Sequence, residues 1–283
     1  MTEVKEAFVR RCLPVRDRDG HKGTFGKVHI LAGSVGFTGA PALSSAAAVR
    51  TGSGLVHLWV PQEIWPVLAI KCQSAMPAPV PPFPALLEKL NQGDGVLIGP
   101  GLGRSRKTDV RTCRLLQRVQ TAVVLDADGI NAVAEHIDVL DTRRGRVTVL
   151  TPHDGEFLRL TGGTPLGPDR EAAAAAFARA HGCVLVLKGH RTITAFPDGE
   201  TFVNTTGNPG MAKGGSGDVL AGMILSLLGQ GLPPKQAVPA AVWLHGRAGD
   251  LAAEALGEYG MTPDDLLQQI PAAIRQTMAG PVD

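Results

Sequence analysis

The sequence contains few cysteines and no long hydrophobic run, and these absences exclude several classes of protein. Its four cysteines, Cys12, Cys72, Cys113 and Cys183, are far apart and form no CxxC pair, so we expect buried thiols in a reducing cytosol rather than a metal or redox motif. No apolar run approaches the length that crosses a bilayer, and the charged N-terminal segment lacks the apolar stretch of a signal peptide. We therefore expect a soluble, cytoplasmic protein that does not bind membranes.

The sequence also lacks an excess of charge of either sign. Lys and Arg number 28 and Asp and Glu 26, so the net charge of +2 gives no general reason to bind nucleic acid. One basic group is spaced like the face of a helix: Lys107, Arg111, Arg114 and Arg118. Aromatic side chains are not interleaved with it, so a solvated helix face is favoured, with an oligomer contact or an acidic partner as the alternative.

Several catalytic and cofactor-binding motifs are absent. The chain has no GxxxxGK(S/T) phosphate loop, no HExxH zinc motif and no nucleophile elbow. The glycine-rich segment from Gly33 to Pro41 does not have the GxGxxG spacing, and no acidic residue follows the next strand to bind a ribose. A Rossmann dinucleotide site is therefore not expected, and any phosphoryl transfer would need a different anion-binding loop.

Short apolar runs alternate with helical patterns along most of the chain. The 283 residues are 44% hydrophobic, which is enough for a substantial core. We predict strands at Val28–Ala32, Leu55–Val60, Gly95–Gly99, Ala122–Asp126, Val147–Leu150 and Cys183–Lys188, and helices at Pro41–Thr51, Lys107–Val119, Gly129–Glu135, Arg170–His181, Gly217–Leu228 and Pro234–Leu256. Because the strands are continuously apolar, this pattern predicts an α/β fold with a mainly parallel sheet covered by helices on both faces.

Two further segments bear on the organisation of the chain. Thr192–Phe196 and Thr201–Asn204 flank a Pro-Asp-Gly turn and predict a hairpin at an edge of the sheet. The proline-rich stretch Pro77–Pro84 lies among apolar residues and is interpreted as a rigid surface loop rather than a linker. With no repeat and no convincing linker, residues 1–283 are predicted to form a single domain.

The segment Asn204–Leu228 carries the strongest functional signal. It places a glycine-rich loop, Gly214–Gly217, directly before Asp218 and a helical pattern. Glycines let backbone N–H groups point at one centre, and a helix N-terminus adds about half a positive charge there. We interpret the loop, led by Asn208–Gly210 and Lys213, as an anion hole, and Asp218 as a proton acceptor for a hydroxyl group. The alternative is a glycine turn closed by an ordinary N-cap aspartate.

Two more glycine-rich loops follow predicted strands. Gly33–Pro41 and Gly99–Gly103 both place glycines where a ligand could approach the backbone. In open α/β sheets, the loops after the carboxyl ends of the strands form the ligand crevice. We therefore interpret both segments as substrate loops. For Gly33–Pro41 the alternative is a structural turn with proline in the first helical turn.

Polar side chains follow two other predicted strands. Asp126 ends one of them without an obvious structural role, which favours a place in the site, whereas Asp128 could simply cap the next helix. Lys188 follows an apolar strand and precedes a glycine, so it could reach a phosphate as a point charge. The alternative for Lys188 is a surface lysine at a strand end.

The segment Thr151–Glu156 also begins where a strand ends. His153 and Glu156 could bind substrate and a hydrated metal ion there. Asp154 or Thr151 could instead serve only to cap the following helix. Because the segment lies on the same side of the predicted sheet as the other motifs, we interpret His153 as a site residue.

Six motifs occur in the order typical of one family. They are AGSVGFTGAPALSSAAAVRTGSGLV, IGPGLG, VLDADGIN, TPHDGEF, VLKGHRTI and NTTGNPGMAKGGSGDVLAG. With them, the chain from Gly20 to Ile274 resembles the ADP- or ATP-dependent NAD(P)H-hydrate dehydratase family of the ribokinase-like superfamily. The resemblance implies a three-layer α/β/α fold and, for the assembled protein, a homotetramer.

The resemblance also implies a function in nicotinamide-cofactor repair. Such enzymes dehydrate (6S)-NADHX or NADPHX, in which water has added to the ring, to NADH or NADPH. The nucleotide phosphorylates the ring hydroxyl, generally with Mg²⁺, and phosphate then leaves, so that ADP becomes AMP. The chain is compact and carries no fused epimerase, which is typical of bacteria, so we expect ADP rather than ATP as donor and a separate epimerase as functional partner.

The same resemblance assigns roles to individual residues. Asp218 would be the catalytic base, and the N–H groups of Gly215, Ser216 and Gly217 would stabilise the phosphoryl group in transfer. The residues expected at the hydrated dinucleotide are Ala40, Gly103, His153, Asp218 and Asp126. The residues expected at the adenine nucleotide are Lys188, Gly189, His190, Arg191, Thr192 and Gly217. Glu156 is the expected metal ligand, with Asp126 as the alternative.

Two other functions remain open at this point. A small-molecule alcohol kinase of the same superfamily would share the loop before Asp218 but release a stable phosphate ester. His153 within TPHDGE and the IGPGLG loop favour the dehydratase. A non-catalytic nucleotide sensor is less favoured, because it needs neither Asp218 nor Lys188.

Overall fold

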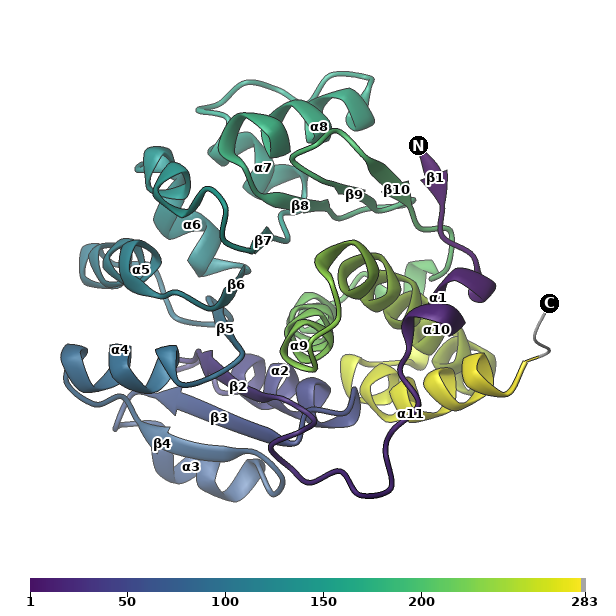
Figure 1. The fold of residues 1–283 in the computed structure, drawn as a ribbon, viewed down its shortest axis with the longest axis horizontal. Helices are drawn as coiled ribbons and strands as arrows, with labels where there is room; N and C mark the ends of the chain where they lie inside the picture. The colour runs from purple at the N-terminus through teal and green to yellow at the C-terminus, as the bar shows by residue number, and fades with distance from the viewer. Residues whose placement is uncertain (281–283) are drawn as a thin grey trace.

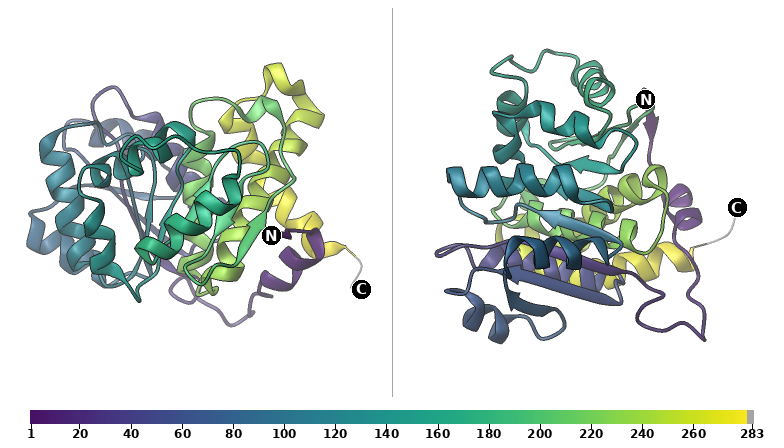
Figure 2. Two further views of the ribbon diagram at one scale, coloured as in Figure 1. Left: turned by 90° about the horizontal axis from the view of Figure 1, so that it is seen from above. Right: turned by 60° about the vertical axis from the view of Figure 1, so that its left-hand side comes forward.

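The computed structural model describes residues 1–280, which form a central sheet between two layers of helices (Figures 1 and 2). The strands are β1 (Thr2–Glu3), β2 (Lys27–Leu31), β3 (Leu55–Val60), β4 (Met76–Pro79), β5 (Gly95–Ile98), β6 (Ala122–Leu125), β7 (Thr148–Leu150), β8 (Val184–Leu187), β9 (Ile193–Ala195) and β10 (Thr201–Val203). Their order across the sheet is β1-β10-β9-β8-β7-β6-β5-β2-β3-β4. Among these described strands only the β8–β9 and β9–β10 pairs are antiparallel. The mainly parallel sheet and the hairpin are thus confirmed.

Helices cover both faces of the sheet. One layer contains α1 (Glu6–Cys12), α2 (Gly39–Arg50), α3 (Trp65–Lys71), α9 (Ser216–Gly229), α10 (Pro234–Gly260) and α11 (Pro263–Ala279). The opposite layer contains α4 (Phe83–Asn91), α5 (Arg106–Arg118), α6 (Asp128–Ala134), the 3₁₀ helix η1 (Ile137–Arg143), α7 (Asp154–Leu160) and α8 (Arg170–His181), and a short 3₁₀ turn η2 (Pro209–Met211) precedes α9. Figure 1 shows α4, α5 and α6 on one side of the sheet and α9, α10 and α11 on the other. The six predicted helices are confirmed, whereas α1, α3, α4, α7 and α11 were not predicted.

The inner strands are continuously apolar because helices bury both of their faces. Every residue of β5 and of β8 is buried. Successive side chains enter opposite cores: Leu97 packs with the α9–α10 layer, whereas Val96 and Ile98 pack with the α4–α8 layer. Side chains of a strand alternate between faces, so each core takes every second residue.

The prediction of a surface loop at Pro77–Pro84 is wrong. Pro77 and Pro79 lie in β4, an edge strand that pairs only with β3 among the described strands. Pro84 lies in the first turn of α4. An edge strand and the first turn of a helix are places where a missing N–H costs no hydrogen bond. The prolines of this stretch therefore belong to β4 and to the start of α4 rather than to a long loop.

Helices α2 and α9 approach each other unusually closely. A Cβ on Gly222 of α9 would lie 2.2 Å from the carbonyl oxygen of Ser44 in α2, so a larger residue does not fit there. The N-terminal turn of α2 contains Ala40, and that of α9 contains Asp218. This contact therefore fixes the spacing between a predicted substrate residue and the predicted base.

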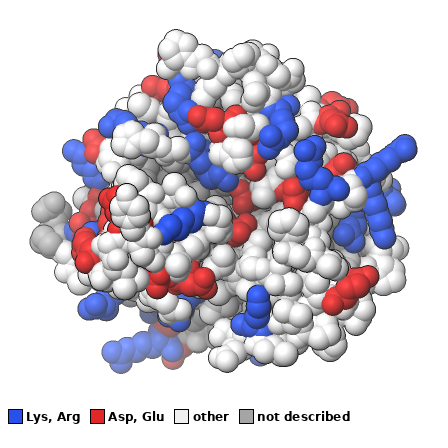
Figure 3. Space-filling view, turned by 180° about the vertical axis from the view of Figure 1, so that it is seen from behind, with Lys and Arg blue, Asp and Glu red and all other residues white. Residues whose placement is uncertain are grey.

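The basic group predicted to form a solvated helix face lies on α5. Lys107, Arg114 and Arg118 are exposed, whereas Arg111 is partly buried, and the guanidinium of Arg114 lies 4.3 Å from the centre of the Phe83 ring. Figure 3 shows one face of the molecule with Lys and Arg interspersed with Asp and Glu. No helix within residues 1–280 is long and apolar enough to span a membrane.

Candidate active site

Three neighbouring parallel strands end in polar side chains that contact one another. Asp126 follows β6, Thr151 follows β7 and Lys188 follows β8. Asp126 is only 1% exposed, and its Oδ1 accepts the Thr151 hydroxyl at 2.6 Å and the Lys188 ammonium at 3.0 Å. Carboxyl ends of parallel strands meet at one edge, so the fold brings these three residues together. Lys188 is therefore not the surface lysine of the alternative interpretation.

Glu156 adds a second carboxylate to this cluster. It is 5% exposed, and its Oε2 lies 3.8 Å from the Lys188 ammonium. The same oxygen accepts the backbone N–H of His153 at 2.8 Å. Burial lowers the pKa of Lys188, but the charges of Asp126, Glu156 and Asp218 outweigh it and leave that pKa raised. Lys188 is thus a firmly held cation among carboxylates.

The cap of α7 differs from the sequence prediction. Neither Thr151 nor Asp154 caps the helix; His153 does, because its Nδ1 accepts the N–H groups of Gly155 and Glu156 at 3.0 and 3.3 Å. Glu156 completes a capping box by accepting the His153 N–H. Histidine is rarely the N-cap residue of a helix, so the residue type at position 153 did not indicate that α7 begins there. The cap leaves the imidazole exposed at the strand edge.

The N-terminus of α9 faces the same cluster. Gly215 precedes the helix with φ of 111°, a left-handed conformation that favours glycine. A Cβ on Gly217 would lie 3.3 Å from the Lys188 Nζ and 3.9 Å from Asp126 Oδ2. The first turn of the helix therefore approaches the ion pair with backbone rather than with side chains. This places helix-end N–H groups beside the partly buried Lys188, an arrangement suited to a phosphate.

Asp218 lies in that first turn and has a strongly perturbed acidity. Burial, followed by the charges of Asp126, Asp128 and Glu156, raises its pKa to about 7, against the opposing effect of Lys188. A carboxyl group with this pKa is near the optimum for accepting a proton at neutral pH. The simple capping role that was the alternative is not observed, because Asp218 is the third residue of α9 and Gly215 occupies the N-cap without a side-chain bond.

The two glycine-rich loops pack against each other. The Gly33 N–H donates to the Pro100 carbonyl at 2.8 Å, and the Ser34 hydroxyl donates to the Gly101 carbonyl at the same distance. Gly99, with φ of 139°, lies so close to the backbone that a Cβ would overlap the Asp126 carbonyl oxygen. The close approach that we assigned to a ligand is therefore explained at Gly99 by neighbouring backbone. Gly103 remains partly exposed beside Ser34.

Asp128 does not cap α6 as predicted. The N-cap is Ala127, which has a positive φ of 48° and no side-chain bond. Asp128 Oδ2 instead accepts the backbone N–H of Gly103 at 2.9 Å. The carboxylate therefore holds one of the predicted substrate loops.

The loop Lys188–Thr192 lies on the other side of the cluster. Gly189 and Thr192 exchange hydrogen bonds between backbone and hydroxyl, and Arg191 has a positive φ of 59°. Arg170, which the sequence did not single out, donates from Nη1 to both Asp154 oxygens at 2.7 and 2.8 Å and from Nη2 to the Lys188 carbonyl at 3.1 Å. This arginine joins the loop to the start of α7.

The residues leading into the anion hole have a structural role. Lys213, which we interpreted as part of the functional motif, donates its ammonium to the carbonyls of Tyr259, at 2.8 Å, and Met261. Gly210 packs against the backbone of Glu258. Both therefore secure the loop to the C-terminal end of α10, and the lysine does not point into the cluster.

A metal site preassembled by the protein is not found. Within residues 1–280 no three His, Cys, Asp or Glu side chains are arranged to hold a metal ion. Glu156, the predicted ligand, already accepts one N–H and faces the Lys188 ammonium. The described side chains therefore form no preassembled cage for a resident cation.

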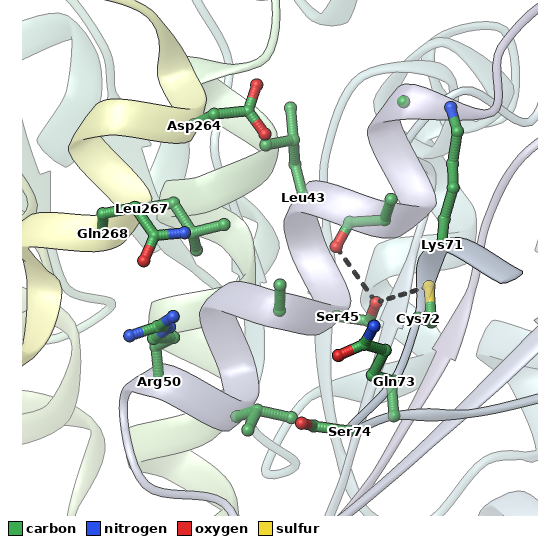
Figure 4. A pocket seen from close by; sticks show the side chains of 15 residues that line it. Leu43, Ser45, Arg50, Lys71, Cys72, Gln73, Ser74, Asp264, Leu267 and Gln268 are labelled. Carbon is green, nitrogen blue, oxygen red and sulfur yellow. Dashed lines mark hydrogen bonds between the residues drawn. The ribbon is translucent and has the colours of Figure 1, made fainter.

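Two hollows lie elsewhere on the described surface. One, of about 540 Å³, lies between α2, α11 and the segment after α3, where Ser45 contacts Cys72 (Figure 4). The other, of about 600 Å³, is bordered by the segment after α1, the end of α2, the end of α9 and α11. Neither is lined by Asp126, Lys188 or Asp218, so the candidate site is the strand edge itself.

The chain that carries these strand-end carboxylates, the partly buried lysine and the glycine-led helix matches a known family. A family model described as NAD(P)H-hydrate dehydratase matches residues 28–272. The chain belongs to this family. Among members with assigned names, a bifunctional NAD(P)H-hydrate repair enzyme Nnr of Moorella thermoacetica is 45% identical over 95% of this chain and 53% of its own length. An ADP-dependent (S)-NAD(P)H-hydrate dehydratase of Neisseria meningitidis is 39% identical over 86% and 82%.

Two solved structures share the fold of this chain. An ADP/ATP-dependent NAD(P)H-hydrate dehydratase of Bacillus subtilis, co-crystallized with ATP/Mg²⁺, superposes with a TM-score of 0.83 at 31% identity and covers 98% of both chains. A ribokinase-like superfamily protein of Enterococcus faecalis gives a TM-score of 0.86 at 29% identity over 98% and 96%. The fold of this dehydratase-family chain is therefore ribokinase-like, as predicted. The chain spans about half the length of the Moorella relative.

Proposed function

We propose that this chain dehydrates the S form of hydrated NADH or NADPH at the expense of an adenine nucleotide, with ADP as the donor. The observation that carries the proposal is Asp218, a carboxyl group with a pKa of about 7 in the first turn of α9, beside the Asp126–Lys188 pair. A weak acid poised at neutral pH next to a helix-end anion hole suits deprotonation of a hydroxyl group during phosphoryl transfer. The names of the family members support the same reaction.

The reaction can be derived from what these residues supply. Asp218 accepts the proton of the ring hydroxyl as that oxygen forms a bond to the terminal phosphorus of ADP. The bond from this phosphorus to the bridging oxygen breaks, and AMP leaves with the electron pair. The N–H groups of Gly215, Ser216 and Gly217 stabilise the charge on the phosphoryl oxygens in transfer. Lys188 adds a fixed positive charge beside them.

The second half of the reaction is an elimination. Hydroxide is a poor leaving group, whereas phosphate leaves readily as the dianion. The ring C–O bond breaks with its electron pair on phosphate, the neighbouring carbon gives up a proton to water, and the electron pair of that C–H bond forms the ring double bond again. The products are then NADH or NADPH, AMP and inorganic phosphate.

The order of the strands favours two binding regions on either side of Asp126. The loops after β2 and β5, with Ala40 and Gly103, would contact the hydrated dinucleotide, together with His153 and Asp126. The loop after β8, formed by Lys188, Gly189, His190, Arg191 and Thr192, would bind the adenine nucleotide with Gly217. The ends of β6 and β7, with Asp126 and His153, lie between these two sets of loops, and α9 contacts β5 and β6. Donor and acceptor would therefore meet at Asp218.

Glu156 or Asp126 would hold Mg²⁺ when the nucleotide is bound, and the ion would supply positive charge beside the phosphates. We further propose an epimerase of the R hydrate as functional partner, in keeping with the bifunctional relatives. The homotetramer and the cytoplasmic location expected from the sequence remain predictions.

The test is recovery of the reduced-nicotinamide absorbance from hydrated NADH. Protein and Mg²⁺ are added with ADP, with ATP or without nucleotide, and AMP and phosphate are quantified alongside. We expect recovery with nucleotide only, limited to the S epimer, and faster with ADP. The Asp218→Asn variant should bind nucleotide but lose turnover by a factor of at least about 100. Nucleotide consumption with a stable phosphate ester and no recovery would identify an alcohol kinase instead.

A further inference from the structure

A buried histidine on α10 contacts the backbone of the anion hole. His245 is 9% exposed, and its Nε2 lies 2.9 Å from the carbonyl oxygen of Ser216, the first residue of α9. A carbonyl only accepts hydrogen bonds, so Nε2 carries the proton and donates it. Burial lowers the pKa of His245 to about 4, with the Lys188 charge acting in the same direction against the Ser216 bond, so the ring is neutral at physiological pH.

The bonded carbonyl belongs to the same peptide unit as the N–H of Gly217. The peptide group is planar and trans, so its C=O and N–H point in opposite directions. A donor that fixes the Ser216 oxygen therefore also fixes the direction of the Gly217 N–H. Withdrawal of electrons through the amide makes that N–H a stronger donor as well. Gly217 borders Lys188 and Asp126, so this N–H belongs to the surface that faces the phosphate in the proposed reaction.

Other groups of α10 hold the segment before the anion hole. The carbonyl of Trp243 accepts the Thr206 hydroxyl at 2.9 Å. The Asp250 carboxylate accepts the Gly207 N–H at 3.0 Å and the Asn208 amide at 3.1 Å. Helix α10 is thus the support for this whole segment, and among these contacts only the one from His245 reaches α9 itself.

We propose that His245 is a positioning residue that orients the Gly217 N–H toward the phosphoryl group in transfer. The expected effect on kcat rests on the proposed function. The expected effect of His245 on the orientation of the Gly217 N–H does not. No step of the reaction uses the imidazole as an acid or base, and it touches no reacting atom. Its contribution is to keep one peptide plane in the catalytic orientation.

The first experiment measures kinetics in two variants of His245. The His245→Leu variant lacks the N–H donor to the Ser216 carbonyl. We expect its kcat to fall by about 10- to 100-fold, because a small displacement of a catalytic group has effects of this size. The KM for nucleotide should stay nearly unchanged. In His245→Gln an amide N–H can replace Nε2, so kcat should recover in large part. Leu244→Ala is the matched control: it weakens the buried side of α10 but leaves the bond. It should lower the melting temperature without lowering kcat.

A second experiment observes the Gly217 amide directly and needs no substrate. Labelling with carbonyl-¹³C serine and ¹⁵N glycine selects glycines that follow serine, and the sequence contains only Gly54 and Gly217 in that position. We expect the Gly217 resonance to shift in His245→Leu, to return toward its original position in His245→Gln, and to respond to added ADP less in the leucine variant. Gly54 is the internal reference and should stay unchanged.

The outcomes separate the two proposals. An unshifted Gly217 resonance in His245→Leu, or equal loss of kcat in His245→Leu and His245→Gln with a normal spectrum, overturns the positioning role. If the wild-type protein fails to restore NADH but Gly217 behaves as expected, the proposed substrate is wrong and the role of His245 in anion binding stands.

Discussion

The carboxylate of Asp128 and the backbone of Gly103 are joined by a hydrogen bond of 2.9 Å that ties the loop after β5 to the start of α6. The other oxygen of Asp128 accepts the Asn131 amide at 3.3 Å, and Asn131 Oδ1 accepts the Arg159 Nε at 2.8 Å. This series of bonds extends from a proposed substrate loop to α7. The orientation of that loop is therefore set by two helices on the same face of the sheet.

Loss of the Asp128 carboxylate should weaken binding of the hydrated dinucleotide selectively. In Asp128→Ala the Gly103 N–H loses its acceptor, and we expect the KM for hydrated NADH to rise about 10-fold, the effect of one lost charged hydrogen bond. The KM for ADP should change little, because the nucleotide loop lies on the other side of β6. Asp128→Asn keeps an acceptor and should raise the KM less. Equal increases in both KM values would contradict this role.

The pH dependence of turnover should report the acidity of Asp218. Its pKa is raised to about 7, so the carboxyl group is protonated below that pH and cannot accept the substrate proton. We expect kcat/KM to fall as the pH decreases through 7. Asp128 is one of the charges that raise this pKa, so the acid limb should move to lower pH in Asp128→Asn. A profile that is flat across neutral pH would exclude Asp218 as the base.

Acid should destabilise the fold through His29. This side chain is 1% exposed, its ring centre lies 4.9 Å from that of His57 and 6.1 Å from that of Trp59, and it accepts the Trp59 indole N–H at 3.1 Å. Burial, followed by the charges of His57, Lys27 and Lys89, lowers its pKa to about 3. The unfolded chain binds a proton near its ordinary pKa of about 6.5, so the stabilisation present above that pH is lost as the pH falls toward 3.

The free energy of unfolding in urea at neutral pH and at about pH 5 measures this effect. One such histidine should cost about 2 kcal/mol over that interval. His29→Asn keeps an acceptor for the Trp59 indole N–H but does not titrate. On acidification its free energy of unfolding should therefore fall by about 2 kcal/mol less than that of the wild type. An identical pH dependence in wild type and variant would show that His29 is not the responsible group.

A buried arginine should stabilise the end of the sheet remote from the site. Arg143 is 1% exposed and donates to the carbonyls of Leu116, Val119, Thr121 and Val147 and to the Thr148 hydroxyl. Arg143→Met removes these five hydrogen bonds from a buried site and should cost about 3 kcal/mol of unfolding free energy, although the Val119 and Val147 carbonyls keep the Arg146 guanidinium and the Val123 N–H as donors. Its kcat should be unchanged, because these acceptors lie at the beginning rather than the end of β6 and β7. Arg118→Met, at an exposed position of α5, is the control and should be nearly neutral.

The sequence predicted the inner strands and six of the helices because their periodicity reflects burial directly. Residues at strand ends, such as Asp126 and Lys188, were also identified, since polar residues after apolar runs are informative in a parallel sheet. Other helices were missed, among them the 17-residue α11 and the seven-residue α7, which begins at an unusual histidine cap. The proline-rich stretch Pro77–Pro84 was wrongly predicted to be a loop. Proline disrupts a strand or helix only where its missing N–H would have donated a hydrogen bond, and the sequence does not show where that is the case.

Contacts between distant segments had no local signal. His245 lies 29 positions after Ser216, and Arg143 binds carbonyls that any residue type would present. Asp128 and Asp126 look alike in the sequence, but one holds a loop and the other an ammonium group. Only the tertiary fold distinguishes these roles.

The contact of Gly222 with Ser44 has a consequence for motion. Because α2 and α9 touch backbone to backbone, the segment bearing Ala40 and the helix bearing Asp218 must move as one rigid body. We therefore expect any opening that admits or releases ligands to occur on the opposite side, where the loop Lys188–Thr192 is attached through the partly exposed Arg170. One side of the site, formed by the segment bearing Ala40 and by α9, would stay fixed, and the loop Lys188–Thr192 on the other side would move. The rate of nucleotide exchange, rather than that of dinucleotide exchange, would then depend on the movement of this loop.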